Sequence, residues 1–291
     1  MLPDPVRASL ERTLDAPVRR AVPVGGGMIS CAARVHVGAE RVFVKWNAAA
    51  PPGIFESEAD GLHRLRRAGA LRVPAVLVVG DPSPVPHIAL EWIESSHPQD
   101  AQAFAWRFGE SLAALHALPG PGRFGLDRDN FLGALPQPNP WHRSWVAFYR
   151  EARLLPLVAR ARRQGLLPAA RELRLRRVVE RLETTLEGFE PAPSLLHGDL
   201  WSGNFLPAGQ EPVVIDPAVY WGAREMEIAF IELFGGFPDG FLDAYRAALP
   251  LDPGYSRRRP VHQLYPLLVH LCHFGEAYGP DVDRACAVAA G

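Results

Sequence analysis

The spacing of apolar residues predicts a strand-rich beginning of the chain. Two stretches, 5–14 and 53–67, place apolar residues at helical spacing, with Phe55, Leu62 and Leu65 on one face of the second. The other apolar segments in this part are short and are bounded by glycine, proline or polar residues, which favours strands. We expect these strands at 32–37, 41–46, 73–80 and 86–93.

Beyond residue 98 the pattern changes to long segments with helical spacing. Phe104 and Phe108 begin the apolar face of the first of them. The pattern predicts an α+β protein with a small β-sheet lobe at 1–93 and a larger, mainly helical lobe at 94–291. We expect the helices of the second lobe at 100–117, 141–164, 169–188, 223–235, 238–248 and 259–276.

Composition narrows the class of protein. The chain has 291 residues, 48% of them hydrophobic and 22% charged, which is ordinary for a globular protein with one large domain or two lobes. A net charge of −1 gives no support for general nucleic-acid or anionic-membrane binding. No stretch reaches the roughly 20 apolar residues of a membrane span, and the N-terminus does not resemble a signal peptide. Three cysteines without CxxC spacing favour a reducing, cytoplasmic setting.

A stretch near residue 200 carries three polar residues at informative positions: Asp199, Asn204 and Asp216. Asp199 directly follows a glycine, so we expect it in a tight loop that Asn204 ends. Two short apolar strands, 205–206 and 213–215, are separated by a Gly-Gln turn signal, and Asp216 follows the second strand. Two strands joined by a turn would bring Asn204 and Asp216 close together.

These three residue types in this order indicate phosphoryl-transfer chemistry. An amide oxygen beside a carboxylate suits a hard cation such as Mg²⁺, and Asp199 would lie near enough to accept a proton from a hydroxyl. A kinase catalytic loop has this arrangement: one Asp orients the nucleophile while an Asn and a second Asp hold the metal on the phosphates. Each residue alone is better explained as a turn or strand cap, but the three together favour the kinase interpretation.

Lysine usage points to a second part of such a site. The 31 basic residues include a single lysine, Lys45, in the strand expected at 41–46. A site that keeps lysine against this bias needs a compact ammonium rather than a planar guanidinium, although chance is the simpler alternative. Glu58 lies in the first turns of the helix expected at 53–67, where a carboxylate also favours the helix dipole. The functional interpretation is that Glu58 pairs with Lys45 and holds it against ATP phosphates.

Two further segments are candidates for nucleotide contacts. Gly25, Gly26 and Gly27 lie between apolar stretches, which predicts a hairpin whose turn lets the backbone approach a ligand closely. A glycine-rich turn alone is a weak signal for a phosphate loop. The strand expected at 86–93 ends in Leu-Glu-Trp-Ile; we expect a hinge between lobes there, with backbone facing an adenine ring, at Glu91, Trp92 and Ile93.

Several motifs together resemble the fructosamine kinase family, also called ketosamine-3-kinases. The resemblance covers nearly the whole chain. Its sharpest part is the Trp-Ser-Gly insert after Asp199, which generic phosphotransferases of the same fold do not usually share. The segments that carry it are the glycine turn, 43–47, 55–59, 129–133, 197–204, 216–225 and 232–238.

The resemblance implies a protein-kinase-like fold, with a small N-terminal antiparallel sheet, shared with aminoglycoside phosphotransferases and choline kinases. It implies that Asp199 is the catalytic base, that Asn204 and Asp216 bind Mg²⁺, and that Lys45 contacts the phosphates of ATP. It further implies that Trp201 stacks on the substrate sugar or backs its pocket. The segment 119–140 is long and rich in proline and glycine, so we expect it, with Asn130, to line the substrate site.

The implied activity is ATP-dependent phosphorylation of the 3-hydroxyl of a ketosamine, on a free amine or on a glycated protein. The product is unstable and sheds the sugar, so the implied role is deglycation. One alternative is a phosphotransferase of the same fold acting on an aminoglycoside, a choline-like alcohol or another sugar. Another, of a different class, is a non-catalytic nucleotide-binding regulator. Nothing in the sequence indicates an oligomeric state.

Overall fold

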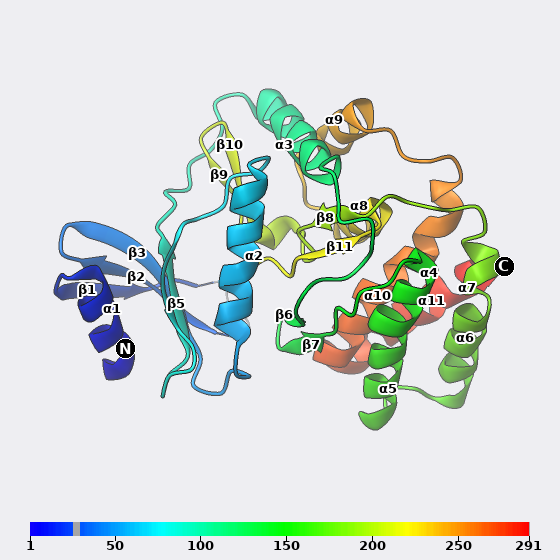
Figure 1. Ribbon diagram of the computed structural model, residues 1–291, viewed down its shortest axis with the longest axis horizontal. Helices are drawn as coiled ribbons and strands as arrows, with labels where there is room; N and C mark the ends of the chain where they lie inside the picture. Colours follow the sequence, from blue (N-terminus) through cyan, green and yellow to red (C-terminus); the bar gives the residue numbers. More distant parts are fainter. Residues whose placement is uncertain (26–29, 291) are drawn as a thin grey trace.

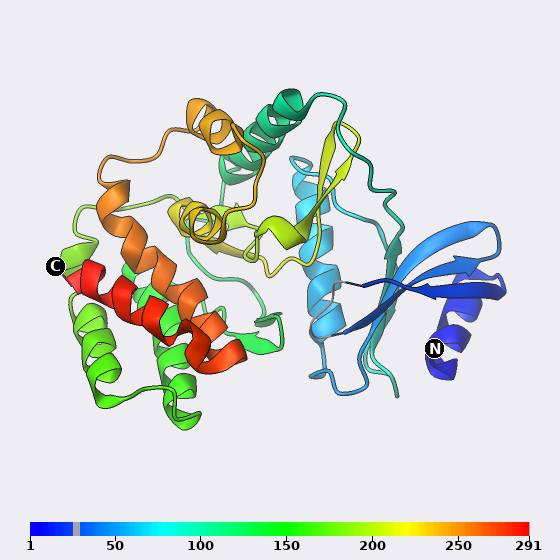
Figure 2. The same ribbon diagram turned by 180° about the vertical axis from the view of Figure 1, so that it is seen from behind.

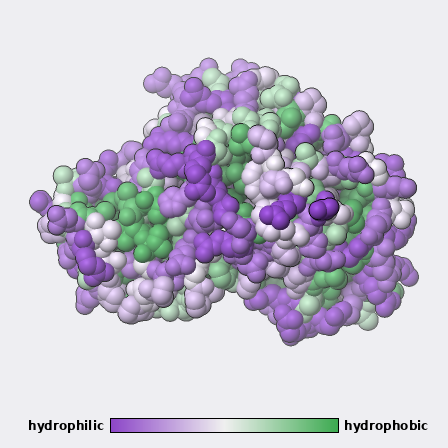
Figure 3. Space-filling model, in the orientation of Figure 1, coloured by the Kyte–Doolittle hydropathy of each residue, from purple (hydrophilic) through white to green (hydrophobic). Residues whose placement is uncertain are grey.

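The computed structural model describes residues 1–25 and 30–290 and has two parts. A β-sheet with two helices forms the first part, and a helical body forms the second (Figures 1 and 2). Hydrophilic residues gather on the face where the two parts meet (Figure 3). The α+β architecture predicted from the sequence is confirmed. The division at residue 93 remains a prediction, consistent with a strand that ends at Glu91 and a helix that begins at Ala101.

The first part is built on one five-stranded antiparallel sheet in the order β1-β2-β3-β5-β4. Valines on alternate positions, such as Val35 and Val37 on β2 and Val42 and Val44 on β3, point to one buried face. The hairpin predicted around the glycine turn is confirmed by the pairing of β1 with β2. The strands are β1 (Val18–Pro23), β2 (Cys31–Val37), β3 (Glu40–Trp46), β4 (Val76–Gly80) and β5 (His87–Glu91).

Two helices accompany this sheet, as predicted. α1 (Asp4–Leu14) buries Val6 and Leu10 with the sheet valines in one apolar cluster. α2 (Ile54–Ala68) lies between the sheet and the second part in both views (Figures 1 and 2). A side chain at Gly61 of α2 would lie only 3.0 Å from the ring of Pro217. The helix that carries Glu58 is therefore held tightly against the segment that follows Asp216.

A hairpin from the second part of the sequence also joins the two parts. β9 (Phe205–Ala208) and β10 (Glu211–Val214) pair antiparallel around the turn at Gly209, as the sequence predicts. Isolated bridges connect β9 to Ser96 and β10 to Arg72. The candidate catalytic stretch is thereby fixed to segments on either side of the predicted hinge.

The helical body differs in detail from the sequence-based expectation. The helix predicted at 141–164 begins only at Trp145 and contains a π-helical turn at Tyr149–Leu154. The helix predicted at 169–188 breaks at Arg181, and the last helix, Gly279–Ala290, was not predicted. The helices are α3 (Ala101–His116), α4 (Trp145–Phe148), α5 (Leu155–Arg163), α6 (Ala169–Glu180), α7 (Leu182–Thr185), α8 (Arg224–Phe234), α9 (Phe241–Ala248), α10 (Tyr255–Phe274) and α11 (Gly279–Ala290).

Two small strand pairs were also not predicted. β6 (Asn130–Leu132) and β7 (Leu135–Gln137) form a hairpin inside the segment expected to be irregular. β8 (Ser194–Leu196) and β11 (Tyr220–Gly222) pair antiparallel and flank the candidate catalytic stretch. Among the described residues, no helix has the length and apolar character needed to cross a membrane.

Candidate active site

The loop after β8 is shaped by a close approach between two backbones. Gly198 has a φ of +85°, and a Cβ there would lie 2.1 Å from the carbonyl oxygen of Ala218. Only glycine tolerates both this conformation and this contact. The amide of Ala218 also donates to the carbonyl of His197 at 2.9 Å. The loop that carries Asp199 is therefore locked to the segment that carries Asp216.

Asn204 lies at the end of this loop, in a short 3₁₀ turn, and contacts the predicted base. Its Nδ2 donates to the carbonyl oxygen of Asp199 at 2.8 Å and to Oδ2 of the same residue at 3.0 Å. The amide of Ile215 donates to the carbonyl of Asn204 at 3.0 Å. The strands β9 and β10 thus bring Asn204 beside the segment that carries Asp216, as predicted.

The single lysine joins both parts of the protein. Nζ of Lys45 donates to both carboxylate oxygens of Glu58, at 2.8 and 2.9 Å, and to Oδ1 of Asp216 at 3.0 Å. The side chains of Lys45 and Glu58 are almost buried, at 13% and 12% exposure, whereas that of Asp216 is 41% exposed. The predicted pair of Lys45 and Glu58 is confirmed, and Asp216 completes a network of three charges.

Burial and these neighbours change the protonation of the site. Burial lowers the pKa of Lys45, but Asp216 and Glu58 outweigh it and hold this pKa above its ordinary value. Burial raises the pKa of Glu58, and Lys45 offsets this only in part. Burial, followed by the charge of Asp216, raises the pKa of Asp199 to about 8, although the hydrogen bond from Asn204 acts in the opposite direction. At neutral pH, Asp199 without a bound ligand is therefore mostly protonated.

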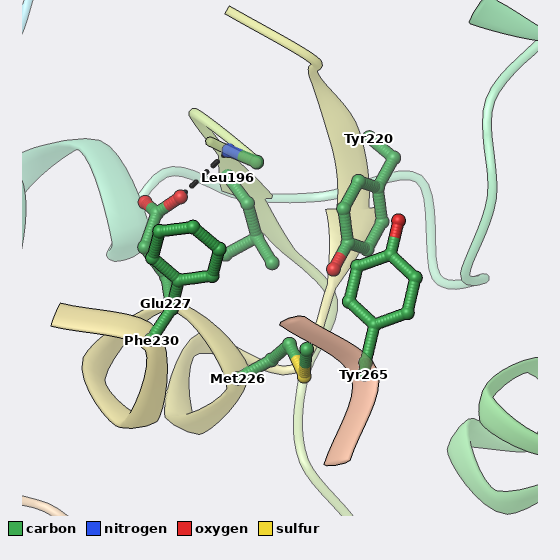
Figure 4. A pocket seen from close by; sticks show the side chains of 7 residues that line it. Leu196, Tyr220, Met226, Glu227, Phe230 and Tyr265 are labelled. Atoms are coloured by element: carbon green, nitrogen blue, oxygen red, sulfur yellow. Dashed lines mark hydrogen bonds between the residues drawn. The ribbon is translucent and has the colours of Figure 1, made fainter. Parts of the chain in front are cut away.

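A buried glutamate that the sequence analysis missed supports the loop from below. Oε1 of Glu227 accepts from the amide of Gly198 at 2.6 Å, and its Oε2 accepts from the amide of His197 at 3.2 Å. Nε2 of His116 lies 2.9 Å from the same Oε2. Figure 4 shows the Glu227 carboxylate pointing from α8 toward the loop. Burial raises the pKa of Glu227, but His116 and these donors outweigh it and hold the pKa below its ordinary value.

The oxygen atoms near the loop fit a magnesium ion in their chemistry. Because Nδ2 of Asn204 is held by Asp199, its Oδ1 is directed away from that residue. Asp216 uses Oδ1 for Lys45, and its carboxylate remains partly exposed. Among the described residues, no three His, Cys, Asp or Glu side chains gather as a metal site. A cation held by Asn204 and Asp216 would therefore need further oxygen ligands, which Mg²⁺ usually takes from phosphates and water.

Asp216 itself has an unusual backbone. Its φ of +57° places it in the left-handed region, which few non-glycine residues adopt and Asp tolerates better than most. Such conformations persist where the surrounding structure fixes them and are frequent at functional sites. The conformation at Asp216 is consistent with a functional role.

The predicted nucleotide contacts lie on the sheet side of the site. Gly25 follows β1, while Gly26 and Gly27 lie outside the described residues. Glu91 ends β5, and its carboxylate accepts from Arg72 at 3.0 Å and from the amide of Ala75 at 3.1 Å. Its side chain is therefore used within the protein, and its backbone amide donates to the carbonyl of Ala75 at 2.8 Å, so neither is free for the predicted contact with adenine.

Trp92 and Ile93, the other two predicted hinge residues, have different surroundings. The ring of Trp92 lies under the guanidinium of Arg34, with 5.3 Å between the ring centroid and Cζ, and Ile93 is buried. The nucleotide contacts of Glu91, Trp92 and Ile93 stay predictions.

The two residues predicted to contact substrate have different surroundings. The side chain of Trp201 is exposed, and its ring covers the position where a Cβ of Gly203 would lie. Asn130 is buried, donates to the carbonyl of Val219 at 2.8 Å, and accepts from Gln137 and Asn139. The substrate contact of Trp201 stays a prediction. The hydrogen bonds of Asn130 tie its side chain to the segment after Asp216, and its substrate contact stays a prediction as well.

Comparison with known proteins decides the family. The profile described as fructosamine kinase matches residues 4–287, which is nearly the whole chain. The chain belongs to the fructosamine kinase family. A probable ketoamine kinase of Synechocystis sp. is 40% identical over 90% of this chain and 87% of its own. A probable ketoamine kinase of Enterococcus faecium is 38% identical over 91% of this chain and 93% of its own.

Solved structures agree with this assignment. A Thermobifida fusca protein, provisionally named as a fructosamine-3-kinase, superposes with a TM-score of 0.88 at 35% identity and 98% coverage of both chains. The aminoglycoside phosphotransferase APH(4)-Ia, in complex with AMP-PNP and hygromycin B, superposes with a TM-score of 0.67 at 18% identity. The second match covers 99% of this chain and 100% of the other. The protein-kinase-like fold predicted from the family resemblance is confirmed.

Replacing the ammonium at Lys45 tests the charge network. We expect Lys45→Arg to weaken the binding of AMP-PNP with Mg²⁺ by at least about tenfold, because the larger, planar guanidinium does not fit the almost buried position that the compact ammonium occupies between Glu58 and Asp216. Isothermal titration calorimetry measures the affinity. Arg41→Lys, at an exposed position of the same strand, is the matched control and should bind as the wild type does. Unchanged affinity in Lys45→Arg would mean that the single lysine has no nucleotide role.

The raised pKa of Asp199 predicts a pH dependence of stability in the nucleotide-free protein. Its pKa is about 8 in the folded state against an ordinary value of 3.8, so the folded state keeps a proton that the unfolded chain loses. The resulting stabilisation is complete below about pH 4 and is lost as the pH rises through about 8. In urea denaturation between about pH 5 and 8, the free energy of unfolding should therefore fall less steeply in Asp199→Asn than in the wild type.

The exposed Asp243 provides the control for this measurement. Asp243→Asn should keep the slope of the wild type, because this side chain is largely exposed to water in the folded state. Equal slopes in Asp199→Asn and the wild type would contradict the assigned protonation.

Proposed function

We propose that this protein transfers the γ-phosphoryl group of ATP to the 3-hydroxyl of a ketosamine. The observation that carries the proposal is the arrangement of Asp199 and Asn204 beside the network of Lys45, Glu58 and Asp216 in a member of this kinase family. Such an arrangement supplies a carboxylate that accepts the proton of the substrate hydroxyl, oxygen ligands for a cation and a positive charge in a fixed position.

Each residue has a role in this proposal that follows from its contacts. Asp199 accepts the hydrogen bond of the sugar hydroxyl and takes its proton during transfer, and Asn204 fixes the orientation of the Asp199 carboxylate. Lys45, released from Asp216 when phosphates enter, neutralises their charge while Glu58 keeps it in place. Asn204 and Asp216 would hold Mg²⁺, which neutralises charge on the transferred phosphate.

The raised pKa of Asp199 fits this sequence of events. The negative charge of Asp216 is one cause of the shift, and a cation bound at Asp216 offsets that charge. Binding of Mg²⁺-ATP would therefore lower the pKa of Asp199 and favour its ionised form when the acceptor is in place. The base is thus activated mainly in the complex that needs it.

In this proposal the substrate is a ketosamine, either as a small molecule or on a glycated protein, and the exposed ring of Trp201 stacks on its sugar. A ketosamine 3-phosphate is unstable and loses the sugar, so the proposed biological role is deglycation. The cytoplasmic location remains a prediction.

The test is ADP release from Mg²⁺-ATP with a panel of acceptors. We expect release with fructose-lysine or ribulose-lysine and only background with an aminoglycoside, choline or buffer. Release with another acceptor alone would keep the phosphotransfer chemistry but refute the ketosamine. No release with any acceptor, together with measurable binding of ATP, would favour a non-catalytic nucleotide-binding protein.

Asp199→Asn is the matched variant for this assay. It keeps the size of the side chain but removes the proton acceptor, so turnover should fall by at least about 100-fold while ATP affinity stays within about twofold. Retained turnover in Asp199→Asn would exclude this residue as the base.

A further inference from the structure

A cavity of about 250 Å³ lies in the helical body, below the β6–β7 hairpin. Its walls come from this hairpin, from the helical segment 149–163 and from α10, which lie together in both ribbon views (Figures 1 and 2). Whole small-molecule ligands usually occupy about 300–1,000 Å³. The cavity therefore has room for part of a small ligand rather than for a nucleotide.

Three arginines line this cavity without carboxylate partners. Arg153, Arg160 and Arg163 come from one helical segment. None of the three forms an ion pair with a described residue, whereas Arg150 pairs with Glu183 and Arg162 pairs with Glu172. Arginines of this segment that point away from the cavity are thus neutralised, and those that line it are not.

Arg153 is fully buried and fixed in position. Its Nη1 donates to the carbonyl of Pro138 at 2.7 Å and its Nη2 to Oδ1 of Asn139 at 2.7 Å, while its Cζ lies 3.9 Å from the ring centroid of Tyr220. Its Nε is buried without a hydrogen-bond partner, as is Nε of Arg160. A buried positive charge with unused donors is costly unless an anion completes it.

The residues that line the cavity carry little negative charge to balance the arginines. Asp129 is the acidic residue among those that line it, and its Oδ1 already accepts from the amide of Asn139 at 2.7 Å. Apolar side chains from Leu132, Leu157 and Val269 form much of the remaining wall, which strengthens electrostatic attraction by lowering the local dielectric constant. The cavity therefore favours an anionic group and disfavours a cationic one.

Shared residues connect the cavity to the candidate active site. Tyr265 lines it and also lines a small cavity beside Gly198, next to the predicted base (Figure 4). Its hydroxyl donates to Oε1 of Gln137, and Nε2 of Gln137 donates to the carbonyl of Ala218, two residues after Asp216, at 3.1 Å. One layer of side chains thus borders both the cavity and the catalytic segments.

We propose that this arginine-lined cavity binds the carboxylate of the acceptor, so that the preferred substrate is the ketosamine of a free amino acid. This inference rests on the proposed function and specifies its substrate class. A glycated lysine within a protein has no free carboxylate near the sugar, and an aminoglycoside carries several positive charges. Both would lack the group that Arg160 and Arg163 favour and that the buried charge of Arg153 attracts.

Two acceptors that differ only in this group provide the test: fructosyl-alanine and fructosyl-alaninamide. Calorimetric titration into the full chain with Mg²⁺-AMP-PNP measures binding without turnover. We expect the carboxylate form to bind at least about tenfold more tightly than the amide, as for a charge-assisted hydrogen bond. Equal affinities, or no binding of either acceptor, would overturn the inference.

Variants test whether the arginines of the cavity cause this difference in affinity. Arg160→Gln with Arg163→Gln should reduce the affinity for fructosyl-alanine by about tenfold and leave that for the amide unchanged. Arg162→Gln, on the same helix but outside the cavity, should behave as the wild type does. A similar loss in Arg162→Gln, or an equal loss for both acceptors, would overturn the inference.

ADP release with the same two acceptors separates this inference from the proposed function. Turnover of both with equal affinity would keep the kinase and reject the carboxylate site. Selective binding of the carboxylate form without turnover would keep the site and reject the ketosamine kinase activity.

Discussion

The ammonium of Lys45, held between two carboxylates, is the interaction on which the rest of the site depends. β3 supplies the lysine, α2 supplies Glu58, and the segment after β10 supplies Asp216. The three charges come from segments far apart in the sequence, so they meet only when the sheet, α2 and the catalytic loops are all in place. A mostly buried ion pair that loses one partner leaves an uncompensated charge, which typically costs about 3–5 kcal/mol. The network therefore forms only when the sheet, α2 and the catalytic loops have their native arrangement, and the candidate site is complete only then.

A second buried charge, the carboxylate of Glu227, holds the backbone of the loop that carries Asp199. The carboxylate of Glu227 is inaccessible to water, yet His116 and the amides of His197 and Gly198 satisfy it. Charged acceptors form the stronger class of hydrogen bond, and here the carboxylate fixes the backbone at His197 and Gly198. Asp199 follows Gly198 directly, so the position of this predicted base depends on Glu227, a buried residue of α8.

Local patterns in the sequence were enough for the sheet, α2 and the polar triad. Short apolar segments predicted β2 and β3, and the order of Asp199, Asn204 and Asp216 predicted the candidate site, because these features depend on residues close together in the sequence. The role of Glu227 depends on a distant contact across the body and leaves only an indirect signal, a glutamate inside the apolar run of α8. The β6–β7 hairpin did leave a local signal, because its two-residue turn begins with Gly133, at a φ of +58°.

The distribution of basic residues follows from the shapes of the two side chains. Arginine stands where a planar group is used: Arg258 pairs with both oxygens of Glu225 and lies over the ring of Phe189, and Arg153 lies over the ring of Tyr220.

Lys45 holds a compact charge between carboxylates from α2 and from the segment after β10, although arginines such as Arg72 and Arg171 also pair with two carboxylates each. A guanidinium directs its donors in a plane, whereas an ammonium can exchange one carboxylate for an incoming phosphate while it keeps the other. Under the proposed function, the single lysine supplies a charge that changes partners while Glu58 keeps it in place.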